Sequence, residues 1–286
     1  MNNLVRKAPN RRTDWDATDA AYPATPGGLQ RRVGLALGLA LASTASLACV
    51  TTPVTGRSAF NLFNAEQDVE LGREAFEEIK AQSNLVRSGP EYDMVQRIMD
   101  RLTPVVEDNI WEWETILIDE PGTVNAFALP GGKMAVYTGM LPVAQSEEGL
   151  AVVMGHEIGH VVARHGTERL SRTSFSEMGV DVVSSLLGAG DYQTLFQMGS
   201  NVLIELPFSR HHEAEADEIG LTYMARAGYD PRAAPAFWNR MEQLGGGGPP
   251  EFLSTHPSAE SRQERLNKLM PRALEIYRDA VGASGP

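Results

Sequence analysis

Five consecutive residues, His156-Glu157-Ile158-Gly159-His160, combine two imidazoles and a carboxylate at a spacing that suits a metal ion. Residues four apart lie on one face of a helix, so His156 and His160 can reach the same ion. Glu157 lies beside the first histidine and can approach a water on that ion without binding the ion itself. The preceding run LAVVM, residues 150–154, is apolar and predicts that this helix is buried. The alternative is that both histidines are core or helix-capping residues and bind no metal.

A catalytic zinc site uses three protein ligands and keeps one position open for water. The segment SRHHEAEADEIGL, residues 209–221, offers the third ligand. Glu213 and Asp217 are four apart, so one can bind the metal while the other holds a ligand histidine through its second ring nitrogen. Spacing does not rank the two carboxylates. Glu215 and Glu218 fall on other faces of this helix, and we expect them to be solvated charges.

Several further segments resemble one known family in the same order along residues 49–280. They are HEIGH at 156–160, SRHHEAEAD at 209–217, NAFALPGG at 125–132, GYDP at 228–231, STHP at 254–257 and PVTGR at 53–57. The chain resembles the HtpX/BepA/LoiP-like zinc metallopeptidases, which include the mitochondrial Oma-type and CaaX-processing enzymes. The resemblance implies a zincin-like fold with one zinc ion per chain. It also implies that His156, His160 and Glu213 bind the zinc and that Glu157 is the general base. Asp217 would then hold one of the ligands in position without binding the zinc itself.

The implied reaction is hydrolysis of a peptide bond, in which zinc acidifies a water and Glu157 transfers its proton to the leaving amine. A non-haem iron site also uses two histidines and one carboxylate. However, a glutamate beside the first histidine has a role in hydrolysis and none in oxygen activation, so zinc is the better assignment.

The segment 123–138 resembles the family's hairpin, whose edge strand lines the active-site cleft. An extended peptide can add to such an edge through backbone hydrogen bonds. We therefore expect Asn125 and Ala126 to contact the substrate backbone. The alternative is that this segment supplies only core strand residues.

His256, in the STHP loop, has three candidate roles. In the related BepA-type proteins the matching histidine can approach the zinc, so His256 can act as a catalytic residue or as a gate that fills the open position. Alternatively, it orders the loop before Pro257. We expect His165, His211 and His212 to lie at the surface or at helix ends. Arg210 and Arg262 can support the fold or an oxyanion, and we favour the structural role.

The elements that must position these residues are mostly helical. Asn64, followed three residues later by Gln67, forms a capping box for a first helix, and a second amphipathic helix covers about 91–103. Strand patterns at 111–118 and 124–138 surround the turn Pro130-Gly131-Gly132, and helical patterns fill most of the chain from 147 to 280. Asp230-Pro231 predicts a helix start. The fold class is therefore α+β, mostly helical, with one small sheet.

The front of the chain resembles an export signal. Arg31-Arg32 precede the apolar segment 33–48, and Cys49 stands where a bacterial lipoprotein carries its lipid. We expect residues 1–48 to be an export signal with a polar N-terminal extension, 49–63 an extended leader, and 64–286 the zinc metallopeptidase domain. Lipidation of Cys49 would anchor the protein to a membrane on the periplasmic side. The alternative is a simple signal followed by an unmodified cysteine.

The amino-acid composition limits the classes of partner that this protein can bind. The 25 Lys and Arg residues against 37 Asp and Glu give a net charge of −12, which argues against nucleic acid as the main partner. One cysteine excludes a disulfide scaffold. The leading prediction is an envelope zinc endopeptidase whose partners are unfolded or misfolded exported proteins. The competing prediction is an outer-membrane protein assembly factor or chaperone with a silenced zinc site.

Overall fold

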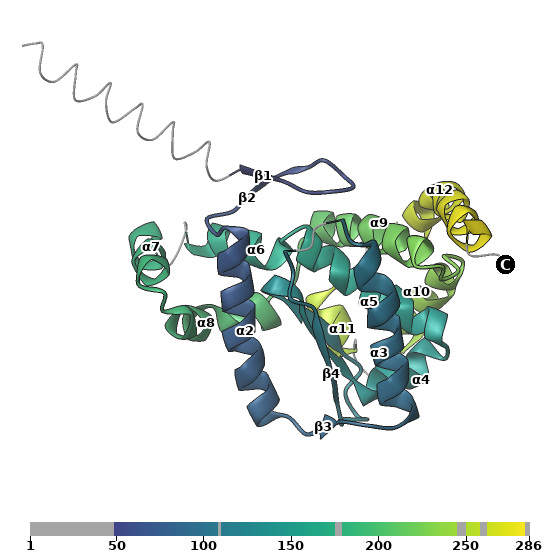
Figure 1. Cartoon of the computed structure of the whole chain (residues 1–286), viewed down its shortest axis with the longest axis horizontal. Coiled ribbons are helices and arrows are strands. Elements are labelled where there is room, and N and C mark those ends of the chain that lie inside the picture. The colour runs from purple at the N-terminus through teal and green to yellow at the C-terminus, as the bar shows by residue number, and fades with distance from the viewer. Residues whose placement is uncertain (1–48, 108–109, 175–178, 245–249, 258–261, 284–286) are drawn as a thin grey trace, which may run out of the picture. The chain divides into compact units, whose positions relative to one another are not determined.

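The computed structural model describes residues 49–107, 110–174, 179–244, 250–257 and 262–283 (Figure 1). The predicted export signal, residues 1–48, lies outside the described part of the chain. Within that part, no helix is long and apolar enough to cross a membrane.

A four-stranded sheet has the order β3-β4-β6-β5. Its strands are β3 (Leu85–Val86), β4 (Glu114–Ile118), β5 (Ala126–Leu129) and β6 (Lys133–Tyr137). β4 and β6 run parallel, whereas β5 pairs antiparallel with β6 and forms the sheet edge. The hairpin and the edge strand predicted from the sequence are therefore confirmed.

The turn between β5 and β6, Pro130–Gly132, is packed directly on α2 (Ala65–Gln82). A side chain at Gly72 would meet the Pro130 carbonyl oxygen at 1.8 Å, so the two backbones touch. Gly131 has a φ of 77°, a conformation that favours glycine. Figure 1 shows α2 and α3 (Pro90–Leu102) flanking the strands. The capping box of Asn64 and Gln67 at the start of α2 is confirmed.

Two buried helices, α5 (Glu147–Val162) and α9 (Arg210–Arg226), cross at the centre of the fold. Each begins with a serine that caps it, because Ser146 accepts a bond from Gly149 N and Ser209 accepts one from His212 N. The crossing depends on small residues. A side chain at Gly220 would lie 2.7 Å from the Gly155 backbone. This close approach brings the metal-binding segments of both helices together.

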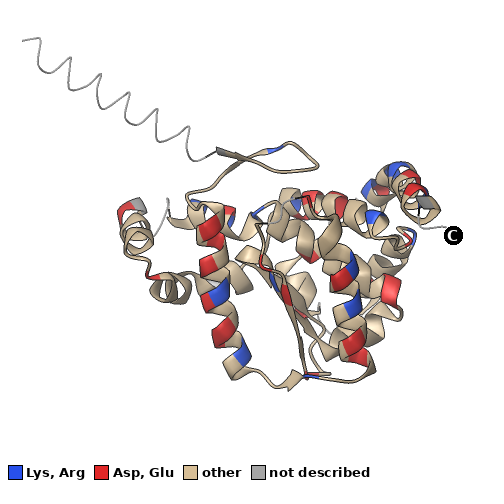
Figure 2. Cartoon of the chain, viewed as in Figure 1, with Lys and Arg blue, Asp and Glu red and all other residues tan. Residues whose placement is uncertain are grey.

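The remaining helices surround this pair. They are α4 (Leu141–Ala144), α6 (His165–Thr173), α7 (Val180–Ala189), α8 (Tyr192–Ser200), α10 (Ala233–Gln243), α11 (Glu251–Thr255) and α12 (Arg262–Ala283), with a π-helical turn at Asn201–Glu205. The sequence does not predict α11. The predicted start at Asp230-Pro231 is displaced, because α10 begins at Ala233 and Asp230 instead accepts a bond from the Arg232 backbone. Charged residues recur along the whole length of α2 and α3 (Figure 2).

The leader is not simply extended. Strands β1 (Cys49–Thr51) and β2 (Ser58–Phe60) pair antiparallel and form a second, two-stranded sheet. The prediction of a single sheet is therefore wrong. We call residues 49–60 the leader hairpin. Cys49 begins β1, and its predicted lipidation stays a prediction.

Candidate metal centre and peptidase site

Four buried side chains converge at the crossing of α5 and α9. His156 and His160 come from α5, Glu213 from the first turn of α9, and His256 from the end of α11. One potential ligand atom from each lies within 4.8 Å of the others. His156 Nε2 and His160 Nε2 are 3.1 Å apart, and each lies 3.3 Å from a Glu213 carboxylate oxygen. The structure thus brings together the three ligands expected from the family and adds His256.

This donor set fits a metal cation. His156 Nδ1 lies 3.0 Å from the Asp217 carboxylate, which can only accept, so neutral His156 presents a lone pair at Nε2. That lone pair faces His160 Nε2 and the Glu213 carboxylate, and such groups repel one another unless a positive charge lies between them. Burial by itself would lower the pKa of His156, but the Glu213 and Asp217 charges outweigh it and raise the pKa to about 9. The site therefore favours a cation.

Asp217 and Glu213 are both held by Arg262 of α12. The guanidinium donates to Asp217 Oδ2 and to Glu213 Oε2, each at 2.8 Å, and Arg262 is fully buried. Burial opposes ionisation of Asp217, but the Arg262 charge outweighs it and lowers the pKa of that carboxyl. Arg262 thus supports the site as well as the fold. Arg210 is exposed.

Glu157 lies next to the convergent group and is 1% exposed. Its Oε2 accepts a 3.0 Å hydrogen bond from the backbone N–H of Ala128 in β5, and its Oε1 lies 3.5 Å from His256 Nε2. Oε1 has no hydrogen-bond partner among the described protein atoms. Burial raises the pKa of Glu157. A carboxylate that favours protonation and keeps one oxygen available is suited to receive and return a proton.

A cleft of about 170 Å³ opens beside Glu157 and His256. Its apolar walls are Phe127, Leu203, Ile204 and Phe208, and two carboxylates, Glu205 and Glu251, lie at its margin. Asn125 also lines this cleft and donates to Glu251 Oε1 at 3.0 Å. Ala126 is fully buried, and its backbone N–H donates a 2.9 Å hydrogen bond to Asn125 Oδ1.

One sequence expectation about a nearby residue is wrong. Glu215 is 5% exposed instead of solvated, and it binds His165, Arg57 and the leader threonines. His165 begins α6 and His212 lies in the first turn of α9, so both are at helix ends as expected, although both are buried. His211 is exposed, as expected. The error arises because α6 and the leader hairpin cover the face of α9 that carries Glu215, whereas His211 lies on a face that stays exposed.

A signal for this burial exists in the sequence. Ile219 follows Glu215 by four residues and so lies on the same face of the helix. An apolar residue at that spacing indicates a face that packs against the protein. The bond between Ala128 and Glu157 had no comparable signal, since it depends on the sheet edge meeting α5.

Comparison with known proteins agrees with this geometry. The model of peptidase family M48 matches residues 91–270, more than half of the chain. The chain is 35% identical over 227 residues to the mitochondrial metalloendopeptidase OMA1 of Schizosaccharomyces pombe. The aligned region covers 77% of this chain and 66% of that protein. It is 41% identical over 176 residues to the mitochondrial metalloendopeptidase OMA1 of Arabidopsis thaliana, and this alignment covers 60% of the chain and 35% of that protein.

A bacterial relative is also similar. The chain is 26% identical over 243 residues to the beta-barrel assembly-enhancing protease of Escherichia coli, covering 80% of this chain and 50% of that protein. The chain thus spans between 35% and 66% of the length of these three relatives. The family match and the relatives show that the chain belongs to peptidase family M48.

Proposed function

We propose that this protein is an exported bacterial zinc endopeptidase that hydrolyses peptide bonds in unfolded or misassembled proteins of the cell envelope. The observation that carries the proposal is the position of Glu157. Its carboxylate lies beside the metal-ligand group and is tied to the backbone of the edge strand β5. A purely structural metal site needs no such carboxylate.

His156, His160 and Glu213 are the residues that would hold the zinc, leaving a position for substrate chemistry. When bound, zinc supplies an acidified water and polarises the scissile carbonyl. Glu157 takes up a proton at Oε1 and returns it to the leaving amine, which its burial-raised pKa favours. His156 is oriented for binding by Asp217, and Arg262 fixes both carboxylates of α9.

The edge of β5 that faces away from β6 supports binding of an extended peptide, although the Ala126 N–H on this edge already donates to Asn125 Oδ1. The carbonyl of Asn125 accepts a bond from Tyr137 N, so the Asn125 backbone faces β6. Successive residues of a strand alternate in direction, and the backbone groups of Ala126 and Ala128 therefore face away from β6. Ala128 already donates to Glu157 in that direction. A substrate strand pairing beside Ala126 would pass next to Glu157, in line with the predicted roles of Asn125 and Ala126.

The edge strand and the cleft together favour unfolded substrates. Backbone pairing requires an extended chain, and the apolar walls formed by Phe127, Leu203 and Phe208 accommodate side chains that folded proteins bury. The envelope location rests on the sequence, in which Arg31-Arg32 and an apolar segment precede Cys49. Among the relatives, the OMA1 proteins are mitochondrial and the Escherichia coli protein is a beta-barrel assembly-enhancing protease.

The proposal is tested with one substrate in two states. Reduced, alkylated lactalbumin and native lactalbumin are incubated with the full chain, with and without a zinc chelator. We expect cleavage of the unfolded form alone, its loss on chelation and its return on adding zinc. Cleavage of both forms at equal rates would contradict the preference for unfolded proteins. No cleavage by a zinc-loaded protein would contradict the peptidase assignment.

His256 favours a second candidate function, an assembly factor or chaperone whose zinc site is silenced. Its Nδ1 lies 3.1 Å from Glu213 Oε1 and 3.4 Å from His156 Nε2, within the ligand group itself. A fourth protein ligand would fill the position that hydrolysis needs. The side chain is held there by a backbone bond from His256 N to Phe252 O and by stacking on Phe252.

His256→Ala separates the two functions. If His256 gates the site, we expect the variant to cleave unfolded protein faster than wild type. If His256 contributes to catalysis, cleavage falls while zinc binding persists. Prevention of aggregation by a wild-type protein that holds zinc but cleaves nothing, even after His256→Ala, would favour the chaperone.

A further inference from the structure

A second group of buried and half-buried polar side chains lies behind His160, on the side away from the metal-ligand group. Its members are His165 and Glu168 of α6 and His212 and Glu215 of α9, together with Thr52, Thr55 and Arg57 of the leader hairpin. We call these seven residues the rear cluster. The peptidase mechanism above uses none of them.

The link to the metal centre is a contact between two histidines. His160 directs Nε2 toward His156 and Glu213, and its Nδ1 lies 3.0 Å from Nδ1 of His165. A histidine that binds metal through Nε2 carries its proton on Nδ1. His160 Nδ1–H therefore donates to His165 Nδ1, which accepts.

This direction determines the next bond. Because neutral His165 accepts at Nδ1, it carries its own proton on Nε2. That atom lies 3.1 Å from Glu215 Oε2 and donates to it. Two hydrogen bonds thus lead from His160 through His165 to the buried carboxylate of Glu215. The proton position in the first bond determines the proton position in the second.

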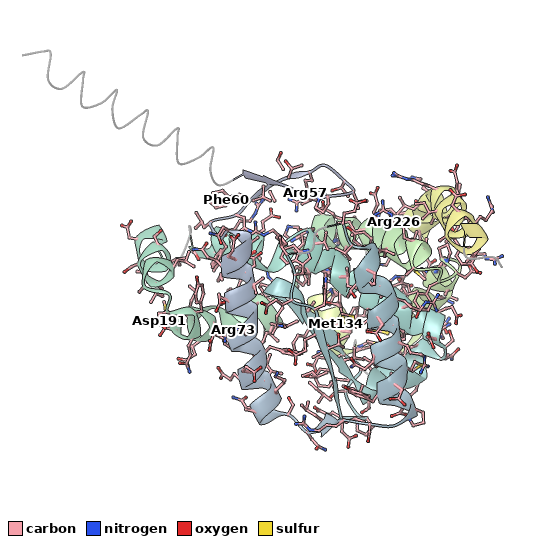
Figure 3. All side chains as sticks on the ribbon, viewed as in Figure 1. Arg57, Phe60, Arg73, Met134, Asp191 and Arg226 are labelled. Carbon is pink, nitrogen blue, oxygen red and sulfur yellow. The ribbon has the colours of Figure 1, made fainter. Side chains whose placement is uncertain are left out.

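Glu215 is in turn held by the leader hairpin. Thr52 Oγ1 donates to Glu215 Oε1 at 2.7 Å, and Thr55 and Arg57 Nε also donate to this carboxylate. Arg57 continues into α6, where its guanidinium forms two bonds with Glu168, at 3.2 and 2.7 Å. Figure 3 labels Arg57 on the leader hairpin. The leader hairpin is therefore connected to the metal ligand His160 by three successive hydrogen bonds, through Glu215 and His165.

The other ligand histidine is supported differently. His156 Nδ1 reaches Asp217 directly, and Asp217 is held by Arg262, so both supports come from the helical core. His160 has no direct carboxylate at Nδ1 and depends on His165 to reach one. Only this second support passes through residues that are separated from α9 by more than 150 positions of sequence.

We propose that His165 and Glu215 are positioning residues for His160, and that the leader hairpin is part of the metal site because it holds Glu215. The inference rests on the metal site of the proposed function and is independent of its substrate. Partners of this kind orient a ligand ring and raise its basicity, and their loss typically lowers metal affinity about 10- to 100-fold. Displacement of the leader hairpin would weaken metal binding in the same way.

The test measures zinc affinity of the full chain by competition with a fluorescent chelator. His165→Phe keeps a ring of similar size and removes the acceptor, so we expect zinc affinity to fall about 10- to 100-fold. His165→Gln can still accept from His160 and donate to Glu215, and we expect it to restore most of the affinity. In the leader hairpin, Thr52→Val and Arg57→Gln should each lower zinc affinity. When these variants are loaded with cobalt instead of zinc, their visible absorption spectra should differ from that of cobalt-loaded wild type.

Matched controls separate positioning from folding. Arg73→Gln removes an exposed arginine of α2 (Figure 3), and His211→Gln removes an exposed histidine of α9, and neither should change zinc affinity. Circular dichroism of each variant reports whether it folds, and Thr52→Val provides a mild change if His165→Phe does not fold. Folded Thr52→Val, Arg57→Gln and His165→Phe proteins that all bind zinc as tightly as wild type would overturn the proposal. A wild type that binds no zinc would instead refute the metal site.

Discussion

The backbone N–H of Ala128 donates a 3.0 Å hydrogen bond to Oε2 of Glu157. This bond joins the edge strand of the sheet to the carboxylate that we propose as the general base. Under the proposed function, a peptide aligned along β5 would be aligned with Glu157 as well, because this bond connects the two. The other carboxylate oxygen is left facing His256 and the cleft.

The close crossing of α5 and α9 can be tested at Gly220. A Cβ at this position would lie 2.7 Å from the Gly155 carbonyl carbon and from His156 N, both backbone atoms. We expect Gly220→Ala to lower the free energy of unfolding by about 1–3 kcal/mol, as overpacking does, and to reduce zinc affinity by displacing His156. Thermal denaturation and zinc titration measure both effects.

Gly188 provides the control for that substitution. It lies within α7 and a Cβ there meets nothing within 4 Å. Gly188→Ala should stabilise the helix by up to about 1 kcal/mol and leave zinc affinity unchanged. If the two alanine variants behave alike, the crossing of α5 and α9 does not depend on Gly220.

The acid dependence of stability can be tested at Glu168. Burial opposes its ionisation, but hydrogen bonds from His212 and Arg57 outweigh burial and lower the pKa of this carboxyl. The lowered pKa stabilises the folded state above the unfolded pKa of about 4.3, and this contribution is lost as the pH falls below that value. Glu168→Gln should therefore cost about 3 kcal/mol at neutral pH and progressively less in acid.

Urea denaturation across this pH range measures the difference between Glu168→Gln and wild type. Glu70→Gln is the comparison, because Glu70 pairs with Arg73 on the exposed side of α2. An exposed pair contributes less than about 1 kcal/mol, so that variant should change little at any pH. A difference between Glu168→Gln and wild type that stays constant with pH would show that the ion pairs of Glu168 do not stabilise the fold.

Local patterns predicted much of this structure. The capping box at Asn64, the glycine turn at Pro130–Gly132 and the i, i+4 histidines depend on neighbours in sequence, and each is found as expected. The position of Glu215 was not predictable in this way. Its partners Thr52 and Arg57 are 163 and 158 residues away, and the pairing exists only once the leader hairpin has docked. Short segments such as α11 are likewise set by tertiary contacts, for example the bond from Phe252 N to Val124 O.

The two carboxylates at the cleft margin predict a preference among substrates. Glu251 and Glu205 line the cleft and are exposed, and they attract a basic side chain near the scissile bond. An exposed ion pair contributes up to about 1 kcal/mol, which corresponds to about a fivefold preference in kcat/KM for a lysine-containing peptide over its glutamine counterpart.

Glu251→Gln should reduce this preference while cleavage of the glutamine peptide stays near wild type. Glu264→Gln, a change of the same kind on the exposed side of α12, should leave the preference intact. High salt should weaken the preference, since the charges are exposed. An unchanged ratio in Glu251→Gln would remove Glu251 from substrate selection.

The most direct test of the peptidase assignment compares wild type with Glu157→Gln on unfolded casein, with the zinc content of both proteins measured. Glutamine keeps the shape of the side chain and an acceptor for Ala128 N–H, but it cannot take up the proton. We expect both proteins to hold a stoichiometric amount of zinc and the variant to cleave about 10²- to 10⁴-fold more slowly. Equal cleavage by both zinc-loaded proteins would contradict the role of Glu157 as the general base.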